Sequence, residues 1–221
     1  MVKKKKSPKK GEKSYLLILL IAFLVFAFLE IDFPDELLHD IIPKQEETTK
    51  QEASKKGDNP GPIEHGPATF TDYELKNSTK GWIEYGLRDK QGRPTEANAL
   101  IKPDMINTGT SANQAIRPPG FISGKAPNNH SRGHLIGKQL GGTGDEMENL
   151  VTLYQNPVNT PFMTKYENMV RKAADNGETI RYRVTPVYKE DEPMPIAVDM
   201  EAKGLDKNST IDFYVTIENK K

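Results

Sequence analysis

A short segment at 128–137, NNHSRGHLIG, holds two histidines four residues apart. On a helix, the spacing of His130 and His134 would suit a pair of zinc ligands, but the zinc-protease pattern has glutamate where this chain has Ser131. Gly133 and the Pro-Asn-Asn run ahead of the histidines also disfavour a helix. Arg132 followed by Gly133 and His134 favours different chemistry, because an arginine fork binds phosphate and a histidine accepts a proton from water near neutral pH. The plain alternative is a turn with a solvated histidine.

More polar residues follow at 149–172, where the sequence predicts a strand, a short connection and a helix. Asn149 begins the run NLVTLY, and Asn159 lies just before the helix. Glu167 comes eight residues after Asn159, which on a helix returns to within about 80° of the same face two turns along. Arg171 follows Glu167 by four residues, so these two side chains are neighbours on a helix. Taken singly, the same residues would form a surface ion pair and cap turns.

The order of these pieces resembles a known family. RGHLIG at 132–137, NLV at 149–151, a second asparagine ten residues after the first, and YENMVR at 166–171 are together similar to the DNA/RNA non-specific endonucleases, which are ββα-metal enzymes. The resemblance extends upstream to IRPPGF at 116–121 and spans roughly 80–190. It is strongest to membrane-anchored and secreted nucleases of Gram-positive bacteria and to toxin nuclease domains. The ordered combination is specific, whereas no single piece is.

The resemblance implies a role for particular residues of this chain. These are a general base, His134; the single protein ligand of a metal ion, Asn159; an acid that holds metal-bound water, Glu167; two arginines near the phosphate, Arg132 and Arg171; and an asparagine that contacts substrate, Asn149. Asn156 is a rival for the metal ligand, because Asn-Pro-x-Asn places two amides close together. The chain departs from the family pattern at Ser131, where many members have aspartate.

The implied site predicts phosphodiester hydrolysis. A neutral amide oxygen plus water molecules suits a hard cation, which favours Mg²⁺ over zinc, with Mn²⁺ as a possible substitute. The expected activity is cleavage of DNA and RNA with His134 as general base and with little sequence preference, because no base-reading motif is evident. Two alternatives remain open: a catalytically weak nucleic-acid-binding module of the same fold, as in DNA uptake, and an anchored non-enzymatic surface protein. An immunity or uptake partner is not identified by the sequence.

Strands and one helix must position these residues. Alternating and β-branched runs predict strands at 81–87, 98–101, 149–154, 179–188, 196–202 and 210–217, with a hairpin turn around Gly92. Thr160 is a plausible N-cap, Pro161 suits the first helical position, and Gly177 is a natural stop. The expected core face of this helix is Phe162, Tyr166, Met169, Val170 and Ala173. The predicted fold class is α+β, with an antiparallel sheet and a metal-site helix.

The N-terminal part of the sequence predicts where the protein is located in the cell. Residues 1–14 hold seven lysines and one acid, and the run at 15–29 has no charged residue. With flanking residues to 33 it is long enough to cross the roughly 30 Å hydrocarbon core, and its basic end stays cytoplasmic. We therefore expect a basic cytoplasmic tail (1–14), a transmembrane signal anchor (15–33), a flexible linker (34–66) and an extracellular nuclease domain (67–221). Cleavage and secretion are the alternative, although an A-x-A-like cleavage pattern is missing.

Composition excludes several classes of protein. The 221 residues contain 31 Lys plus Arg and 31 Asp plus Glu, so the chain does not bind nucleic acid through bulk positive charge. Any phosphate contact must come from a local cluster of cations. The absence of cysteine excludes a disulfide scaffold, a cysteine-based zinc finger and a cysteine nucleophile. The 155 residues from 67 to 221 are enough for a domain with its own core.

Overall fold

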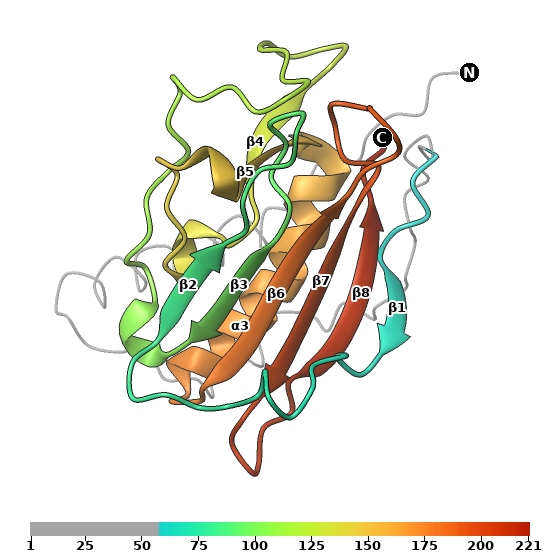
Figure 1. Ribbon diagram of the computed structural model, residues 1–221. Helices are drawn as coiled ribbons and strands as arrows, with labels where there is room; N and C mark the ends of the chain where they lie inside the picture. Colours follow the sequence, from blue (N-terminus) through green and yellow to red (C-terminus); the bar gives the residue numbers. More distant parts are fainter. Residues whose placement is uncertain (1–57) are drawn as a thin grey trace, which may run out of the picture. The chain divides into compact units, whose positions relative to one another are not determined.

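The computed structural model describes residues 58–221, which form an antiparallel six-stranded sheet with a helix across one face (Figure 1). The sheet has the strand order β1-β8-β7-β6-β3-β2. Its strands are β1 (Ile63–Gly66), β2 (Trp82–Tyr85), β3 (Ala97–Ile101), β6 (Ile180–Val187), β7 (Ala197–Gly204) and β8 (Asp212–Glu218). A separate hairpin pairs β4 (His130–His134) with β5 (Leu150–Tyr154), and the main helix is α3 (Thr164–Asp175). The predicted α+β class is confirmed.

Shorter helical turns connect these elements. They are the 3₁₀ turns η1 (Pro103–Met105), η2 (Lys138–Leu140) and η3 (Met147–Asn149), and a wide π-helical segment, η4 (Gln155–Met163), which leads from β5 into α3. Strands β3 and β6 are direct neighbours, and Ile101 pairs with Ile180 at their shared end. The hairpin, η4 and α3 therefore belong to one long excursion of the chain, which leaves the sheet after β3 and returns to it at β6.

All six predicted strands are present. In β6 the alternation of side chains buries Ile180, Tyr182 and Val184 toward the helix, as expected. Its other face is covered rather than solvated, because the guanidinium of Arg181 lies 4.7 Å from the ring centre of Phe70. The predicted turn between β2 and β3 is also confirmed, since Gly92 donates its N–H to the Asp89 carbonyl at 2.8 Å.

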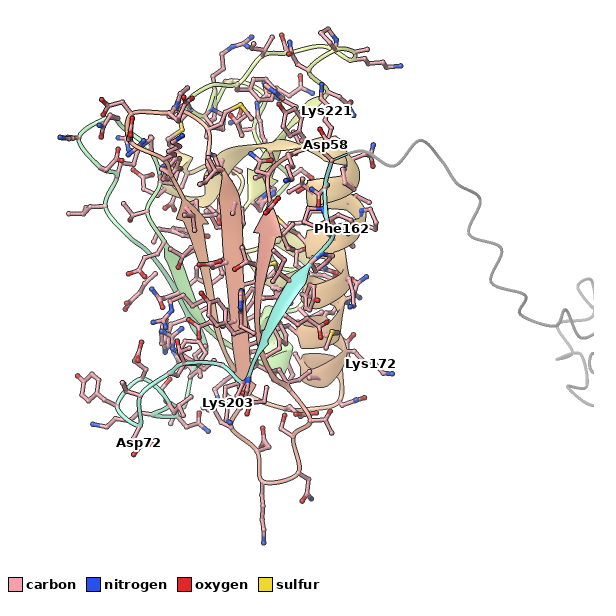
Figure 2. The ribbon with its side chains drawn as sticks, turned by 90° about the vertical axis from the view of Figure 1, so that its right-hand side faces the viewer. Asp58, Asp72, Phe162, Lys172, Lys203 and Lys221 are labelled. Carbon is pink, nitrogen blue, oxygen red and sulfur yellow. The ribbon has the colours of Figure 1, made fainter. Side chains whose placement is uncertain are left out.

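Figure 2 shows the layers edge-on, with α3 on one side of the sheet and Asp72 on the other. The core lies on the helix side, where the sheet, the β4–β5 hairpin and α3 pack together. Its large, fully buried side chains include Leu135, Leu153, Met163, Tyr166 and Tyr182. The opposite face is covered by the chain around Asp72, where the backbone N–H of Thr69 donates to Glu201 at 2.7 Å.

Two strands were not predicted. Strand β4 has the polar sequence HSRGH with a central glycine, and its extended form depends on pairing with β5 rather than on its own residues. Strand β1 is an exposed four-residue edge strand that pairs with β8. The side chain of Asn59 also donates to the Glu218 carbonyl at 2.9 Å. Residues 58–66 therefore pack with the folded part, ahead of the expected start at residue 67.

The late helix differs in part from the prediction. The backbone of Thr160 is extended (φ −138°, ψ 125°), but no backbone N–H within residues 58–221 donates to its hydroxyl, and α3 begins only at Thr164, so Thr160 is not the N-cap that the sequence predicted. Gly177 adopts a left-handed conformation (φ +93°) just past the end of α3, which confirms it as the stop. Tyr166, Val170 and Ala173 are buried as expected, and Phe162 is partly buried. Met169 is 38% exposed, so its assignment to the core was wrong.

The expected membrane anchor at 15–33 and most of the expected linker lie outside the described residues. Between residues 58 and 221, no helix is long and apolar enough to cross a bilayer.

Candidate active site

A cleft of about 620 Å³ opens between the hairpin, the start of α3 and the loop that follows η1. Its lining residues are Asn107, Gly109, Ser111, Ala112, His134, Gly137, Lys138, Gln139, Asn159, Thr164, Glu167 and Arg171. Of the residues singled out in the sequence, the cleft brings together His134, Asn159, Glu167 and Arg171. Arg132, Asn149 and Asn156 do not line it.

His134 ends strand β4 and is held by the opposite wall of the cleft. Its Nε2 lies 3.0 Å from the backbone carbonyl of Thr110. A carbonyl oxygen only accepts hydrogen bonds, so Nε2 carries the hydrogen, and in the neutral imidazole Nδ1 is left as the acceptor. Burial lowers the pKa of His134 below its usual 6.5, and the nearby charge of Lys138 acts in the same direction, while the Thr110 carbonyl opposes them. At neutral pH this histidine is therefore an unprotonated base.

Asn159 lines the cleft just before α3. Its Nδ2 donates to the Gln155 side-chain oxygen at 3.3 Å, and its main-chain carbonyl accepts from the Thr164 hydroxyl at 3.0 Å. Within residues 58–221, no hydrogen bond is donated to Asn159 Oδ1. A partly buried, preoriented amide oxygen without a donor fits a hard cation such as Mg²⁺. Asn156, the rival, is exposed and has an extended backbone (φ −126°, ψ 136°).

Glu167 lies on the first turn of α3 with its carboxyl group against the backbone at Gly137. A Cβ atom on Gly137 would lie only 2.7 Å from Glu167 Oε1, so glycine leaves the space that this carboxyl group occupies. Gln139 donates to Oε2 at 3.3 Å. Burial raises the pKa of Glu167 from its ordinary 4.5 to about 7, with the Gln139 hydrogen bond opposing the shift. The carboxylate is thus costly to ionise until a cation or a donor approaches.

This shift predicts a gain in stability when Glu167 is replaced by glutamine. Because the folded-state pKa lies above the unfolded value, ionised Glu167 destabilises the fold as pH rises from about 4.5 to 7. In the metal-free chain, Glu167→Gln should therefore raise the free energy of unfolding by about 1–3 kcal/mol near pH 8. Near pH 4, where both side chains are neutral, urea unfolding should give the two chains equal stability. A gain of equal size at both pH values would mean that ionisation is not the cause.

The charged partner of Arg171 and the separation of the two histidines both differ from what helical spacing would give. Arg171 lines the cleft and forms an ion pair with Asp175 at 3.4 Å, rather than the pair with Glu167 that its spacing suggested.

His130 is four residues from His134 on an extended strand, so their Cα atoms are separated by about 13 Å. The two histidines therefore do not form a common zinc site. In residues 58–221, no cluster of three or more His, Cys, Asp or Glu side chains is placed to hold a metal.

Arg132 contacts the loop beside the cleft instead of facing into it. Its Nε donates to the Ile116 carbonyl at 2.6 Å, and its guanidinium lies 4.1 Å from the ring centre of Phe121. A second donor reaches the Gln114 carbonyl at 3.0 Å. In this arrangement Arg132 holds the IRPPGF loop against β4. Ser131, on the other face of β4, is 3.4 Å from the Leu153 carbonyl.

Asn149 is a buried clamp. Its Oδ1 accepts from the Ile136 N–H at 2.8 Å, and its Nδ2 donates to the carbonyls of Ile136 and Thr143 at 3.1 and 2.7 Å. The side chain is fully buried, and all of these partners are backbone groups of the loop that carries the cleft residues after His134. Asn149 is thereby a positioning residue in this structure, whereas the sequence suggested a substrate contact.

Removal of this clamp should destabilise the protein. Asn149→Ala leaves three backbone groups without partners, two of them buried and one partly buried, and each buried group costs about 1–3 kcal/mol. We expect the free energy of unfolding to fall by about 3 kcal/mol or more in urea titrations. Asn156→Ala, which changes an exposed asparagine seven residues later, is the matched control and should leave stability within about 0.5 kcal/mol. Unchanged stability of Asn149→Ala together with weaker DNA binding would restore the substrate-contact assignment.

Several residues of this site carry no sequence signal of their own. Thr110 contributes only its carbonyl, and Gln139 and Gln155 act through other side chains. Gly137 belongs to the RGHLIG run, yet its role becomes visible only when Glu167 is placed against it. Lys138 follows directly after that run and lines the cleft. A hydropathy pattern does not report these contacts, because each depends on the approach of two distant segments.

An antiparallel hairpin followed by a helix, with a histidine on the first strand and an asparagine and a glutamate at the helix start, is the ββα unit of metal-dependent nucleases. The sequence from residue 73 to 205 matches the family model described as DNA/RNA non-specific endonuclease. This match covers more than half of the chain. The chain therefore belongs to the DNA/RNA non-specific endonuclease family, as its sequence motifs predicted.

Solved structures of nucleases share this fold. NucA from Streptococcus agalactiae with a magnesium ion bound is 25% identical, with a TM-score of 0.61 over 75% of this chain and 86% of that chain. The same nuclease with no metal bound is 26% identical, with a TM-score of 0.54 over 68% and 76% of the two chains. The Sda1 nuclease with a bound zinc ion is 21% identical, with a TM-score of 0.58 over 72% and 90%.

Proposed function

We propose that this protein is a Mg²⁺-dependent endonuclease that hydrolyses DNA and RNA with little sequence preference. The observation that carries the proposal is the meeting, in one cleft, of His134 Nδ1 and Asn159 Oδ1, two acceptors to which no group of residues 58–221 donates a hydrogen bond. Mn²⁺ is expected to substitute for Mg²⁺. The NucA structure with bound magnesium supports this choice of cation. Because the Sda1 nuclease structure has a bound zinc ion, the cleavage assay must also include zinc.

Four of the residues that line the cleft have a chemical task in this mechanism: His134, Asn159, Glu167 and Arg171. His134 Nδ1 accepts the proton of the attacking water, while the Thr110 carbonyl fixes the ring. Asn159 Oδ1 and Glu167 would hold the cation and its surrounding water molecules. The bound cation would offset negative charge on the scissile phosphate and on the departing 3′-oxygen. Arg171 is placed to contact the phosphate from α3, and Arg132 supports the loop wall.

The test is cleavage of supercoiled plasmid DNA and of RNA by the full chain. We expect relaxed and linear DNA with Mg²⁺ or Mn²⁺, and no cleavage after EDTA removes the cation. Zinc alone should support less activity than Mg²⁺. Binding of DNA without cleavage under every metal condition would favour the alternative of a catalytically weak binding module of the same fold, for example in DNA uptake.

We also propose that residues 15–33 hold the protein in the cell membrane with the nuclease domain outside. The lysine-rich end and the uncharged run support this location. Separation of membranes from culture medium, followed by detection of the nuclease domain, checks it. Recovery of a chain that starts near residue 30 from the medium would contradict it and leave the nuclease proposal intact.

A further inference from the structure

The cleft contains a lysine that the proposed mechanism does not use. The ionisable residues that line the cleft are His134, Lys138, Glu167 and Arg171. Arg171 has Asp175 as an acidic partner at 3.4 Å. Lys138 is exposed, and its Nζ lies 3.3 Å from the Ser111 hydroxyl. Among residues 58–221, no carboxylate pairs with Lys138, so this cleft cation is available for an anion.

The backbone of Lys138 is held firmly although its side chain is exposed. The Lys138 carbonyl accepts from the N–H groups of Gly109 and Gly141, each at 3.2 Å. The approach to Gly109 is close enough that a Cβ there would lie 2.6 Å from this carbonyl. Both Gly109 and Ser111 belong to the loop that contacts His134 through Thr110. Lys138 is therefore fixed to the same wall that orients His134.

The position of Lys138 relative to His134 indicates which anion the Lys138 ammonium can bind. The Lys138 ammonium is close enough to lower the pKa of His134 by its charge, yet its hydrogen bond is to Ser111, next to the residue that holds the ring. Arg171 reaches the cleft from α3, and Lys138 reaches it from the wall formed by η2 and the 107–112 loop. A strand of nucleic acid in the cleft would thus meet cations from two different walls.

We infer that Lys138 binds the phosphate next to the scissile one, so that the cleft recognises a chain with at least two consecutive phosphates. The inference rests on the proposed nuclease function, because that function places the scissile phosphate beside His134 and Asn159. An ammonium group binds phosphate as a point charge, without reading bases. Lys138 thereby favours polynucleotides over small phosphodiesters and adds no sequence preference.

The test compares Lys138→Met with wild type in the full chain, on DNA and on bis(p-nitrophenyl) phosphate, which has a single phosphodiester. On DNA we expect KM to rise about three- to tenfold with kcat within about twofold. The dependence of log(kcat/KM) on log salt should become shallower by about one. On the single phosphodiester, measured near pH 8 where His134 is unprotonated in both proteins, the variant should stay within about twofold of wild type. Lys138→Arg should keep most of the DNA affinity.

The control is Lys172→Met, which removes the same charge from an exposed lysine on α3 that does not line the cleft. Figure 2 shows Lys172 near the opposite end of the helix segment from Phe162. Lys172→Met should behave as wild type on both substrates. Equal losses in both lysine variants would show bulk charge and overturn the inference. Equal loss of Lys138→Met on both substrates, or a fall in kcat at constant KM, would place Lys138 at the reacting phosphate and also overturn it.

A binding measurement separates this inference from the proposed activity. Fluorescence anisotropy of a labelled DNA oligonucleotide in EDTA reports affinity without cleavage. Lys138→Met should weaken this binding about three- to tenfold relative to wild type and to Lys172→Met. If wild type cleaves nothing with any metal, the proposed function fails, and this affinity difference still decides whether Lys138 binds phosphate. Equal affinity of all three proteins would contradict the inference.

Discussion

Replacement of His134 by alanine is expected to lower kcat for DNA cleavage at least about a hundredfold, because loss of a general base typically costs 10²–10⁴ in rate. The imidazole has Nε2 bonded to the Thr110 carbonyl, and no donor in the described part of the chain reaches Nδ1, which is the arrangement that a proton acceptor needs. The variant should still fold and still retard DNA in a gel, since the cations of the cleft remain. Plasmid cleavage with Mg²⁺, followed over time, measures the effect.

His130→Ala is the matched control, four residues earlier on the same strand. His130 accepts from the Ile122 N–H at 3.2 Å and packs against Tyr154, outside the cleft, so this variant should keep most of the activity. A His130→Ala variant without activity, beside an active His134→Ala, would show that the wrong histidine was named. Burial lowers the pKa of His134. A charged imidazole does not accept a proton, so activity should fall at acidic pH with a midpoint below pH 6.5.

The second large effect is expected at Asn159. Asn159→Ala removes the oriented amide oxygen and should lower activity about 10²–10³-fold, because a misplaced cation forfeits several kcal/mol of transition-state stabilisation. Activity across a series of Mg²⁺ concentrations is the measurement, and the variant should need more Mg²⁺ for half of its reduced maximum. The Gln155 hydrogen bond that orients the amide in wild type has no partner left in this variant.

Asn156→Ala provides the comparison within the same Asn-Pro-x-Asn run. Its side chain is exposed and does not line the cleft, so we expect activity within about threefold of wild type. Equal losses in the two variants would remove the basis for choosing Asn159 over Asn156. Cleavage by wild type that persists in EDTA would overturn the metal assignment as a whole.

The elements that hold the sheet were predictable because their signal is local. β6 alternates apolar core residues with polar residues of the other face, and α3 repeats buried residues at helical spacing, so Tyr182 and Val170 were placed correctly from the sequence. β4 was missed because HSRGH has neither pattern and becomes a strand only against β5. Met169 fits the helical spacing but lies at the edge of the buried stripe.

The site was predictable only as a set of residues. Motif order selected His134, Asn159 and Glu167, and the fold brings all three to one cleft. Motif order does not report the direction of a side chain. Arg132 therefore passed as a phosphate contact, although its guanidinium donates to the carbonyls of a neighbouring loop. Asn149 likewise belongs to the motif, yet its side-chain amide is hydrogen-bonded to backbone groups of Ile136 and Thr143.

The pairing of Ile101 with Ile180 has a consequence for how such an enzyme can change over evolution. The chain that builds the cleft departs from and rejoins the sheet at one point, so insertions and deletions in the loops within 102–179 leave the register of β3 and β6 unaltered. The sheet is a constant scaffold, and the loops of the segment inserted between β3 and β6 can vary. Lineages can therefore lengthen or replace the loop walls, and with them the preferred substrate, without redesigning the scaffold that supports α3.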